Sequence, residues 1–338
     1  MSYDLVGIGN ALVDIQVMTD DSLIESLGLV KGGMTLSSQE DQVRLLKKLS
    51  GHSQKISSGG SAANTIHGMG ILGANTYYLG RVANDDYGKY YSEDMQASGA
   101  GFSGPDIEES STGTSVIMIT PDGQRTMLTH LGISAELHPG NVDTTIVSSA
   151  KMVYIEGYLW TGDRSRAAAS KMAETAQAAG IPVAFTLSDF FVAESFTKSL
   201  IDFVRCHVDI LFCNEIEAKA LTGKNETQKA FEELQAITKT LFVTLGSQGS
   251  QTATAEGESA VVKAFPVKVI DTTGAGDLYA AGALYGMLRK YSLEECAIIG
   301  SYCASNTVSH LGGRMPVHAH VNLAKIIKSY RELNKSTA

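Results

Sequence analysis

The stretch from Asp271 to Asp277 reads DTTGAGD and runs into the alanine-rich segment LYAAGALYGML. This pattern predicts a loop that opens a helix over 277–290, with small residues at the turn and a carboxylate in the first helical turn. Small residues let a substrate phosphate approach the backbone, and the unpaired N–H groups of a helix start attract an anion. Asp277 would then accept a proton from the attacking hydroxyl. An Asp after a glycine turn also occurs in many proteins without such a role.

Two other phosphate-binding patterns do not fit the candidate loops. No G-x-x-x-x-G-K-[ST] loop occurs in the sequence. At the glycines after the first predicted strand and in the DTTGAGD loop, the dinucleotide pattern G-x-G-x-x-G is broken, because Leu12 and Tyr279 stand where the third glycine belongs. The sequence therefore favours neither a Walker A loop nor a nicotinamide-binding fingerprint.

The regular structure around this motif alternates between strands and helices. Apolar runs predict strands, and segments with helical spacing follow them. This alternation is typical of an α/β fold with a mostly parallel central sheet and helices on both faces. The predicted strands are 3–9, 76–82, 152–158, 183–187, 210–214 and 241–246, and the predicted helices are 40–50, 87–98, 163–179, 194–204, 215–222, 228–237, 293–309 and 319–333.

Two segments do not follow this alternation. TSVIMIT and RTMLTHL alternate in polarity around Pro121, Asp122 and Gly123, which predicts a hairpin. We expect the segments near 11–36 and 110–132 to form a small β lid over the carboxyl edge of the sheet. We find no linker or internal repeat, so we predict a single α/β domain over 1–338.

Composition narrows the class of protein. The chain has 338 residues, 43% apolar and 19% charged, with a net charge of −9 and a pI near 5.4. An acidic balance disfavours nucleic acid and anionic membranes as partners. The first residues do not resemble a signal peptide, no run reaches the roughly 18 apolar residues of a membrane span, and no C-x-x-C pair occurs. We expect a cytoplasmic enzyme with reduced thiols.

Other polar groups cluster near predicted strand ends. Gly59, Gly60 and Asn64 offer backbone N–H groups and an amide to sugar hydroxyls, and Asn10 and Asp14 follow the first strand. Each group is also compatible with an ordinary turn or cap.

The middle of the chain carries two further candidates. Asn214 and Glu217 combine an amide with a carboxylate that can hold Mg²⁺ through its waters, or they form a helix N-cap. The turn from Thr244 to Gly249 is small enough to admit a nucleotide. Tyr158 and Trp160 end a strand, where they either pack in the core or stack on a substrate base.

Taken together, GGSAAN, NEIE and DTTGAGD resemble in type, order and spacing the motifs of the ribokinase-like (PfkB) carbohydrate kinases. The resemblance covers nearly the whole chain. Within the family the chain is most similar to the adenosine kinase branch, on the stretches GNALVDI, TGTSVIMITPDGQRT, FCNEIEA and CASNTVSHLGGRMP.

The resemblance implies a role for each motif residue. Asp277 matches the catalytic base, and Arg125 matches an arginine that approaches the transferred phosphate. The remaining roles are an anion hole at Gly274, Ala275 and Gly276, substrate binding by Asn10, Asp14, Gly59, Gly60 and Asn64, organisation of Mg²⁺ and phosphate by Asn214 and Glu217, a nucleotide loop at Thr244 and Gly246, and a monovalent-cation (K⁺) loop at Asp271 and Thr273 with backbone near Gly313.

The implied reaction is transfer of phosphate from ATP, with Mg²⁺, to the hydroxymethyl group of a nucleoside, with adenosine as the preferred acceptor. A free sugar or sugar acid is the alternative, because sugar and nucleoside kinases share these motifs. A binding protein that has lost catalysis and a dehydrogenase are weaker alternatives. The resemblance is compatible with a monomer or a homodimer and leaves the K⁺ requirement open.

Overall fold

The computed structural model describes residues 2–105, 110–315 and 322–335. Most predicted helices are present within two residues of their expected ends. The last predicted helix, 319–333, begins outside the described residues, and its described part is α13 (Leu323–Lys335). The predicted helix 194–204 is two helices, α7 (Phe190–Ser195) and α8 (Thr197–His207). No helix in these described ranges is long and apolar enough to cross a membrane.

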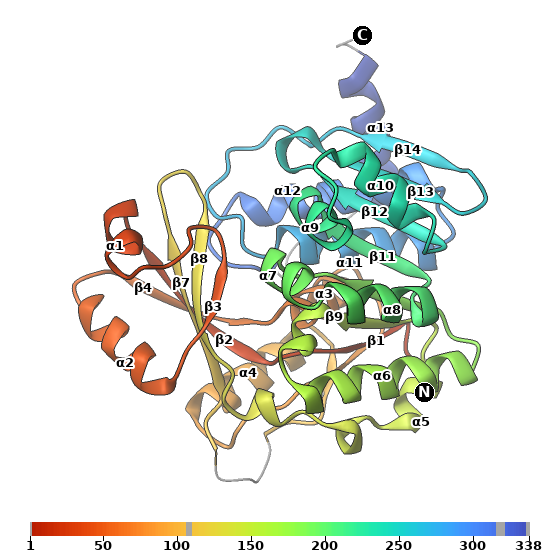
Figure 1. Ribbon diagram of the computed structural model, residues 1–338. Helices are drawn as coiled ribbons and strands as arrows, with labels where there is room; N and C mark the ends of the chain where they lie inside the picture. Colours follow the sequence, from red (N-terminus) through yellow and green to blue (C-terminus); the bar gives the residue numbers. More distant parts are fainter. Residues whose placement is uncertain (1, 106–109, 316–321, 336–338) are drawn as a thin grey trace.

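A nine-stranded sheet forms the body of the molecule (Figure 1). Its strands pair in the order β14-β13-β12-β11-β10-β9-β1-β5-β6. The seven parallel strands are β1 (Leu5–Ile8), β5 (Thr76–Leu79), β6 (Gly101–Phe102), β9 (Val153–Glu156), β10 (Val183–Thr186), β11 (Ile210–Asn214) and β12 (Thr240–Thr244). At one edge β13 (Ser250–Thr254) and β14 (Ser259–Val262) run antiparallel.

The strand residues alternate between two hydrophobic layers, as a pleated strand requires. Leu5 and Tyr154 contact the helices on one face, while Val6 and Val153 contact those on the other. The first layer contains α3 (Ser61–Ile71), α4 (Asp86–Ala97), α11 (Ala275–Leu288), α12 (Leu293–Val308) and α13. The second contains α5 (Thr144–Ser148), α6 (Asp163–Ala178), α7, α8, α9 (Glu215–Thr222) and α10 (Thr227–Gln235). Helices thus cover both faces of a mostly parallel sheet, as predicted.

Helix α11 is deeply enclosed. Every residue from Leu278 to Leu284 is buried, and α3 and α12 pack directly against it. A helix that is apolar on all sides belongs inside a protein, which explains the alanine-rich sequence. The start of α11 is thereby held rigidly at the carboxyl edge of the sheet.

A second sheet projects from this edge as the lid (Figure 1). Its order is β3 (Met34–Leu36), β8 (Arg125–His130), β7 (Gly113–Ile119), β2 (Leu12–Met18) and β4 (Gln54–Gly59). Both predicted lid segments contribute strands, and the predicted hairpin is β7–β8. The sequence analysis missed β4, because its first residues are polar and exposed and show no alternation.

The lid carries its own small hydrophobic core on the face away from the pocket. Helices α1 (Asp21–Ser26) and α2 (Gln39–Lys48) cover this face. Leu45 and Leu49 of the α2 region pack against Val17, Val116 and Met118 of the strands. The opposite face of the lid is left to cover the edge of the body.

Candidate active site

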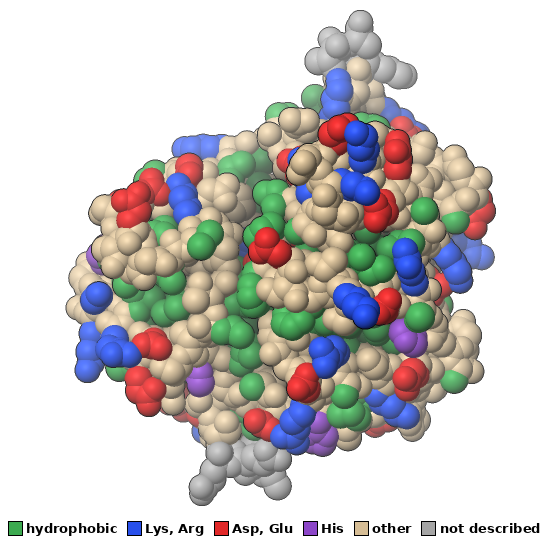
Figure 2. Space-filling model, viewed as in Figure 1, with side chains coloured by type: hydrophobic (Ala, Val, Ile, Leu, Met, Phe, Trp, Pro, Cys, Tyr) green, Lys and Arg blue, Asp and Glu red, His purple; other side chains and the backbone are tan. Residues whose placement is uncertain are grey.

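A pocket lies between the lid and the carboxyl edge of the central sheet. Figure 2 shows a hollow between these two parts, with hydrophobic side chains gathered along it. The polar side chains in the pocket include Asn10, Asp14, Asn64, Arg125, Glu156 and Asp277. Lid residues and their neighbours line it with apolar groups: Leu12, Met34, Leu36, Ile117, Met127 and Leu131. The pocket is therefore lined by charged groups around Asp277, called here its charged end, and by apolar groups that come mostly from the lid strands, called here its apolar end.

Asp277 lies at the charged end, in the first turn of α11. Its Oδ1 accepts a hydrogen bond from Ser61 Oγ at 2.7 Å, and its Oδ2 accepts one from Asn64 Nδ2 at 2.9 Å. Burial raises the pKa of Asp277, while these two hydrogen bonds and Arg125 oppose the rise. A carboxylate held by two donors at a pocket wall is oriented to receive a proton.

The two glycines before α3 allow the chain to pass very close to the substrate residues. Gly60 has φ of +95°, and a Cβ there would collide with the carbonyl oxygen of Asn10. A Cβ at Gly59 would collide with the carboxylate of Asp14. Gly60 lines the pocket, whereas Gly59 packs directly against the carboxylate of Asp14. Only glycine fits both positions.

Asp14 is buried in the wall of the pocket. Burial is the main reason that its pKa rises to about 7; Arg314 and Arg125 lower it, and Asp271 and Asp277 raise it further. A carboxylate that is kept in the folded protein at such an electrostatic cost is a candidate for ligand binding.

Glu156 is a site residue that the sequence analysis missed. It is fully buried at the end of β9, where it accepts hydrogen bonds from Asn10 N at 2.7 Å and from Ala62 N at 2.8 Å. Burial raises the pKa of Glu156 to about 7, against the effect of these two backbone donors. The residue is the single polar side chain of an apolar run, which is the one signal that could have identified it.

Arg314 is the second missed residue. It forms an ion pair with Asp94 of α4, its Nε lies 3.4 Å from Asn64 Oδ1, and its guanidinium lies 5.7 Å from the ring centre of Tyr91. Because an arginine can only donate, it fixes Oδ1 of Asn64 on its own side and turns the Nδ2 group toward Asp277. Arg314 therefore orients the amide that orients the candidate base.

The loop before α11 is hydrogen-bonded to the loop that contains Gly312. Asp271 accepts hydrogen bonds from Thr273 N and Oγ1 at 2.8 and 2.6 Å, and from Gly312 N at 2.9 Å. Gly274 has φ of +73°, and a Cβ there would collide with Gly313. The predicted anion hole lies here. The N–H of Ala275 donates to Thr272 O at 3.2 Å, so Gly274 and Gly276 are the better candidates for donors.

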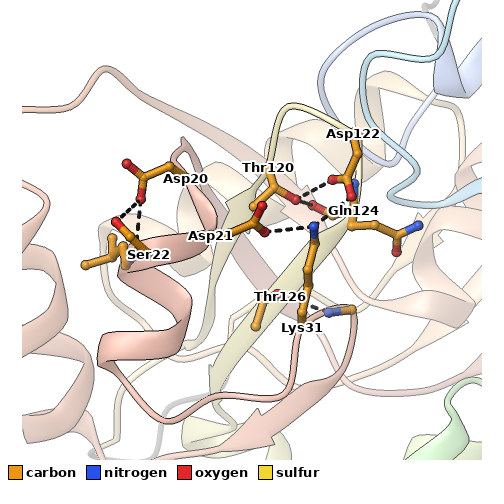
Figure 3. Close-up of polar contacts among 10 residues, drawn as sticks. Asp20, Asp21, Ser22, Lys31, Thr120, Asp122, Gln124 and Thr126 are labelled. Atoms are coloured by element: carbon orange, nitrogen blue, oxygen red, sulfur yellow. Dashed lines mark hydrogen bonds and ion pairs between the residues drawn. The ribbon is translucent and has the colours of Figure 1, made fainter.

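The tip of the β7–β8 hairpin reaches this loop. Thr272 Oγ1 donates to the carbonyl of Gly123 at 3.0 Å. Figure 3 shows how the tip is held: Lys31 bridges Asp21 and Asp122, at 2.7 Å from each. The lid is thus closed onto the start of α11.

Arg125 begins β8, two residues after this tip, and its side chain lies in the pocket. Burial lowers the pKa of Arg125, but surrounding acidic groups, Tyr158 and Asp277 among them, outweigh burial and raise it. A permanent positive charge therefore faces Asp277 from the lid, where a phosphate would gain from it.

The predicted nucleotide residues lie at neighbouring strand ends outside this pocket. Asn214 and Thr244 are opposite each other in the β11–β12 pairing, and Gly246 begins the turn after β12. Asn214 and Glu217 form a capping box, with Asn214 Oδ1 accepting from Glu217 N at 2.8 Å. Burial raises the pKa of Glu217 to about 7, and both Arg125 and Asp277 influence it. Asn214 is therefore the N-cap of α9, and Glu217 lies within electrostatic range of Arg125 and Asp277.

The two aromatic candidates separate in the structure. Tyr158 lines the pocket and donates to Asp189 Oδ2 at 3.1 Å. Trp160 is 2% exposed and packs between Phe185 and Phe203 in the core, so it is not a stacking surface. No group of three His, Cys, Asp or Glu side chains in the described part of the chain could hold a metal ion directly.

Comparisons with known proteins agree with this site. Residues 21–319 match the pfkB family carbohydrate kinase. The structure of adenosine kinase from Sinorhizobium meliloti is 38% identical, with a TM-score of 0.90 over 97% of this chain and 99% of that chain. A probable sugar kinase from Rhizobium etli is 34% identical, with the same TM-score and coverage. Adenosine kinase 2 of Arabidopsis thaliana is 27% identical over 337 residues, 92% of this chain and 96% of the relative.

The fold and the motif residues around Asp277 thus define a phosphotransferase of the ribokinase-like class. The chain belongs to the pfkB family of carbohydrate kinases. Among its relatives are adenosine kinases and sugar kinases.

Replacing Arg314 with Met tests whether this residue orients Asn64. The apolar stem is retained, but the donor to Asn64 Oδ1 is lost, so we expect kcat to fall about 100-fold with a much smaller change in KM. The matched control is Asp94→Asn, which removes the ion pair but leaves Arg314 beside Asn64. Steady-state kinetics on both variants check the prediction. Equal losses in the two variants would mean that Arg314 acts only through the ion pair.

Replacing Asp14 with Asn tests how much the buried charge of Asp14 lowers the free energy of unfolding. The folded pKa of about 7 lies above the ordinary 3.8, so the folded state holds the proton more tightly. The stabilisation from Asp14 is therefore complete below about pH 4 and is lost as pH rises through 7, by at most about 4 kcal/mol. We expect Asp14→Asn to gain stability relative to the wild type between pH 5 and 8, as measured by denaturant unfolding. The exposed Asp202→Asn serves as control. If the difference in unfolding free energy between Asp14→Asn and the wild type were the same at pH 5 and at pH 8, the raised pKa of Asp14 would be refuted.

Proposed function

We propose that the protein is an ATP-dependent nucleoside kinase that phosphorylates the hydroxymethyl group of adenosine to give AMP. The observation that carries the proposal is Asp277, oriented by Ser61 and Asn64, at the charged end of a pocket whose other end is apolar. A ribose fits the charged end and a base fits the apolar end. The similarity to the Sinorhizobium meliloti adenosine kinase supports this choice of acceptor.

The proposed mechanism begins with the sugar. Asp14 accepts hydrogen bonds from vicinal hydroxyls, and Gly60 allows the backbone to approach the ring. The hydroxymethyl group then points at Asp277, which removes its proton as the oxygen attacks the γ-phosphate; the bond between the γ-phosphorus and the β-phosphate oxygen breaks and ADP leaves. The N–H groups at the start of α11 and the guanidinium of Arg125 stabilise the charge on the transferred phosphate. The lid, whose tip accepts a hydrogen bond from Thr272 at Gly123, excludes water and suppresses hydrolysis of ATP.

The residues at the β11 end fit an indirect role toward Mg²⁺. Each carboxylate oxygen of Glu217 accepts one hydrogen bond from Asn214, at 3.0 and 2.8 Å, which leaves each oxygen able to accept another from a metal-bound water. Magnesium, when bound, supplies charge neutralisation for the phosphates. Thr244 and Gly246, on the adjacent strand end, would border the nucleotide. The loop of Asp271 and Thr273, which is held against Gly312, stays our candidate for a K⁺ effect.

A sugar kinase of the same family is the second candidate function. The specific observation in its favour is the similarity to the probable sugar kinase from Rhizobium etli. Asp14, Asn64 and Asp277 would serve a free sugar as well as a ribose, because all three lie at the charged end of the pocket.

A substrate panel tests the choice between these acceptors. We expect ADP formation from ATP, with Mg²⁺ and K⁺ present, on addition of adenosine and little on addition of ribose, fructose or a sugar acid. The reason is that a free sugar leaves the apolar end of the pocket uncovered. Turnover with a free sugar alone would overturn the proposed acceptor while keeping the kinase.

Replacing Asp277 with Asn tests the assignment of the base. The amide keeps the shape and the hydrogen bond to Ser61 but cannot take a proton, so we expect kcat to fall by roughly 10²- to 10⁴-fold with acceptor binding nearly intact. Ser61→Ala is the control, because it removes one donor and keeps the carboxylate; its loss should stay below about tenfold. Acceptor binding is measured by calorimetry and kcat by steady-state kinetics, on both Asp277→Asn and Ser61→Ala. Lost binding with preserved turnover per bound substrate would show that Asp277 is not the base.

A further inference from the structure

The pairing register of the lid places a row of polar side chains along one line. Asp14 of β2 is opposite Ser115 of β7, which is opposite Thr129 of β8, and Leu36 of β3 ends the row. All four line the pocket. Adjacent strands are about 4.8 Å apart, so the two hydroxyls lie roughly 5 and 10 Å from Asp14 along the row. The row leads from the charged end of the pocket toward the apolar end.

The pocket-lining residues in the two neighbouring rows of the lid are apolar. Ile117, Met127 and Met34 are in register with one another two residues along the strands, and all three line the pocket. Leu12 and Leu131 line it on the other side of the row. The two hydroxyls therefore form a narrow polar strip between apolar walls. A flat ring with a polar edge matches such a slot.

The hydroxyls of Ser115 and Thr129 are bonded to each other and are nearly enclosed. Their oxygens are 2.8 Å apart, either can be the donor, and each residue is 3% exposed. One hydroxyl hydrogen is used between them, so the pair retains one further hydrogen and several lone pairs. Because the direction of the shared bond can reverse, the pair can donate to a ligand atom or accept from one. A cross-strand hydroxyl pair also stabilises a sheet, but this one faces the pocket.

We infer that the Ser115–Thr129 pair determines specificity by hydrogen bonding to the polar edge of a nitrogen heteroaromatic base, while Ile117, Met127 and Leu131 contact the faces of its ring. This inference rests on the proposed nucleoside acceptor. With the ribose hydroxyls on Asp14, the group attached to the ribose lies over the next two strands, where the pair is. A single sugar ring held at Asp14 would be too short to reach the more distant hydroxyl of Thr129.

The test pairs lid variants with altered bases. Adenosine is compared with analogues in which one ring nitrogen is replaced by C–H or the amino group is removed. In the wild type, at least one analogue should lose about tenfold in kcat/KM through the missing hydrogen bond. In the double variant Ser115→Ala/Thr129→Val, the same analogue should equal adenosine within about twofold. Thr129→Ser keeps the hydroxyl and should keep the discrimination.

The controls separate this role from lid stability and from the proposed function. Thr114→Val alters the next residue of β7, whose hydroxyl bonds to Gln42 on the other face of the lid; it should lower the unfolding temperature but keep the discrimination. Discrimination that is the same in the wild type and the double variant would overturn the role of the pair. A wild type that phosphorylates free sugars but no nucleoside would overturn the proposed function itself.

Discussion

The site depends on one buried carboxylate, Glu156. The chain leaves the body for the lid after β1 and returns to it before α3, and Glu156 accepts one backbone N–H from each of these crossings, at Asn10 and at Ala62. The two crossings carry Asp14 on one side and Ser61 with Asn64 on the other. Unsatisfied N–H groups at this depth would be costly, and a single carboxylate satisfies both. The proposed substrate residues of the lid and those of the body are therefore both anchored by Glu156.

The same region gathers more negative charge than a stable core would contain. Asp14, Glu156 and Glu217 each have a pKa raised to about 7, with burial as the main cause, and Arg125 and Arg314 supply the opposing charge. Such crowding destabilises the ionised folded state but pre-positions acceptors for hydroxyls and metal-bound waters. Arg314 serves the resting structure through Asp94 and Asn64, whereas Arg125 faces the pocket from the lid.

How far the sequence predicts this structure depends on how local each interaction is. The strand–helix alternation, the hairpin and the loop at Gly274 follow from short patterns, because turns and helix starts are encoded by adjacent residues. Glu156 and Arg314 were missed because their partners lie 146 and 250 residues away along the chain. The polar edge strand β4 was missed because pairing, and not its own composition, makes it a strand. Trp160 was left between two interpretations until its ring contacts in the core decided it.

The choice of acceptor depends on the part of the chain where local patterns say least. The body contributes the proposed base, the loop at α11 and the strand ends, and these are the elements that the relatives named as adenosine kinases and as sugar kinases would share. The apolar end of the pocket comes instead from the lid: Met34, Ile117 and Met127 face it only because three strands pair in one register. A shift of one residue in that register would turn these side chains to the other face of the lid. On the proposed assignments, acceptor specificity therefore depends on strand pairing in the lid, while catalysis depends on the start of a helix.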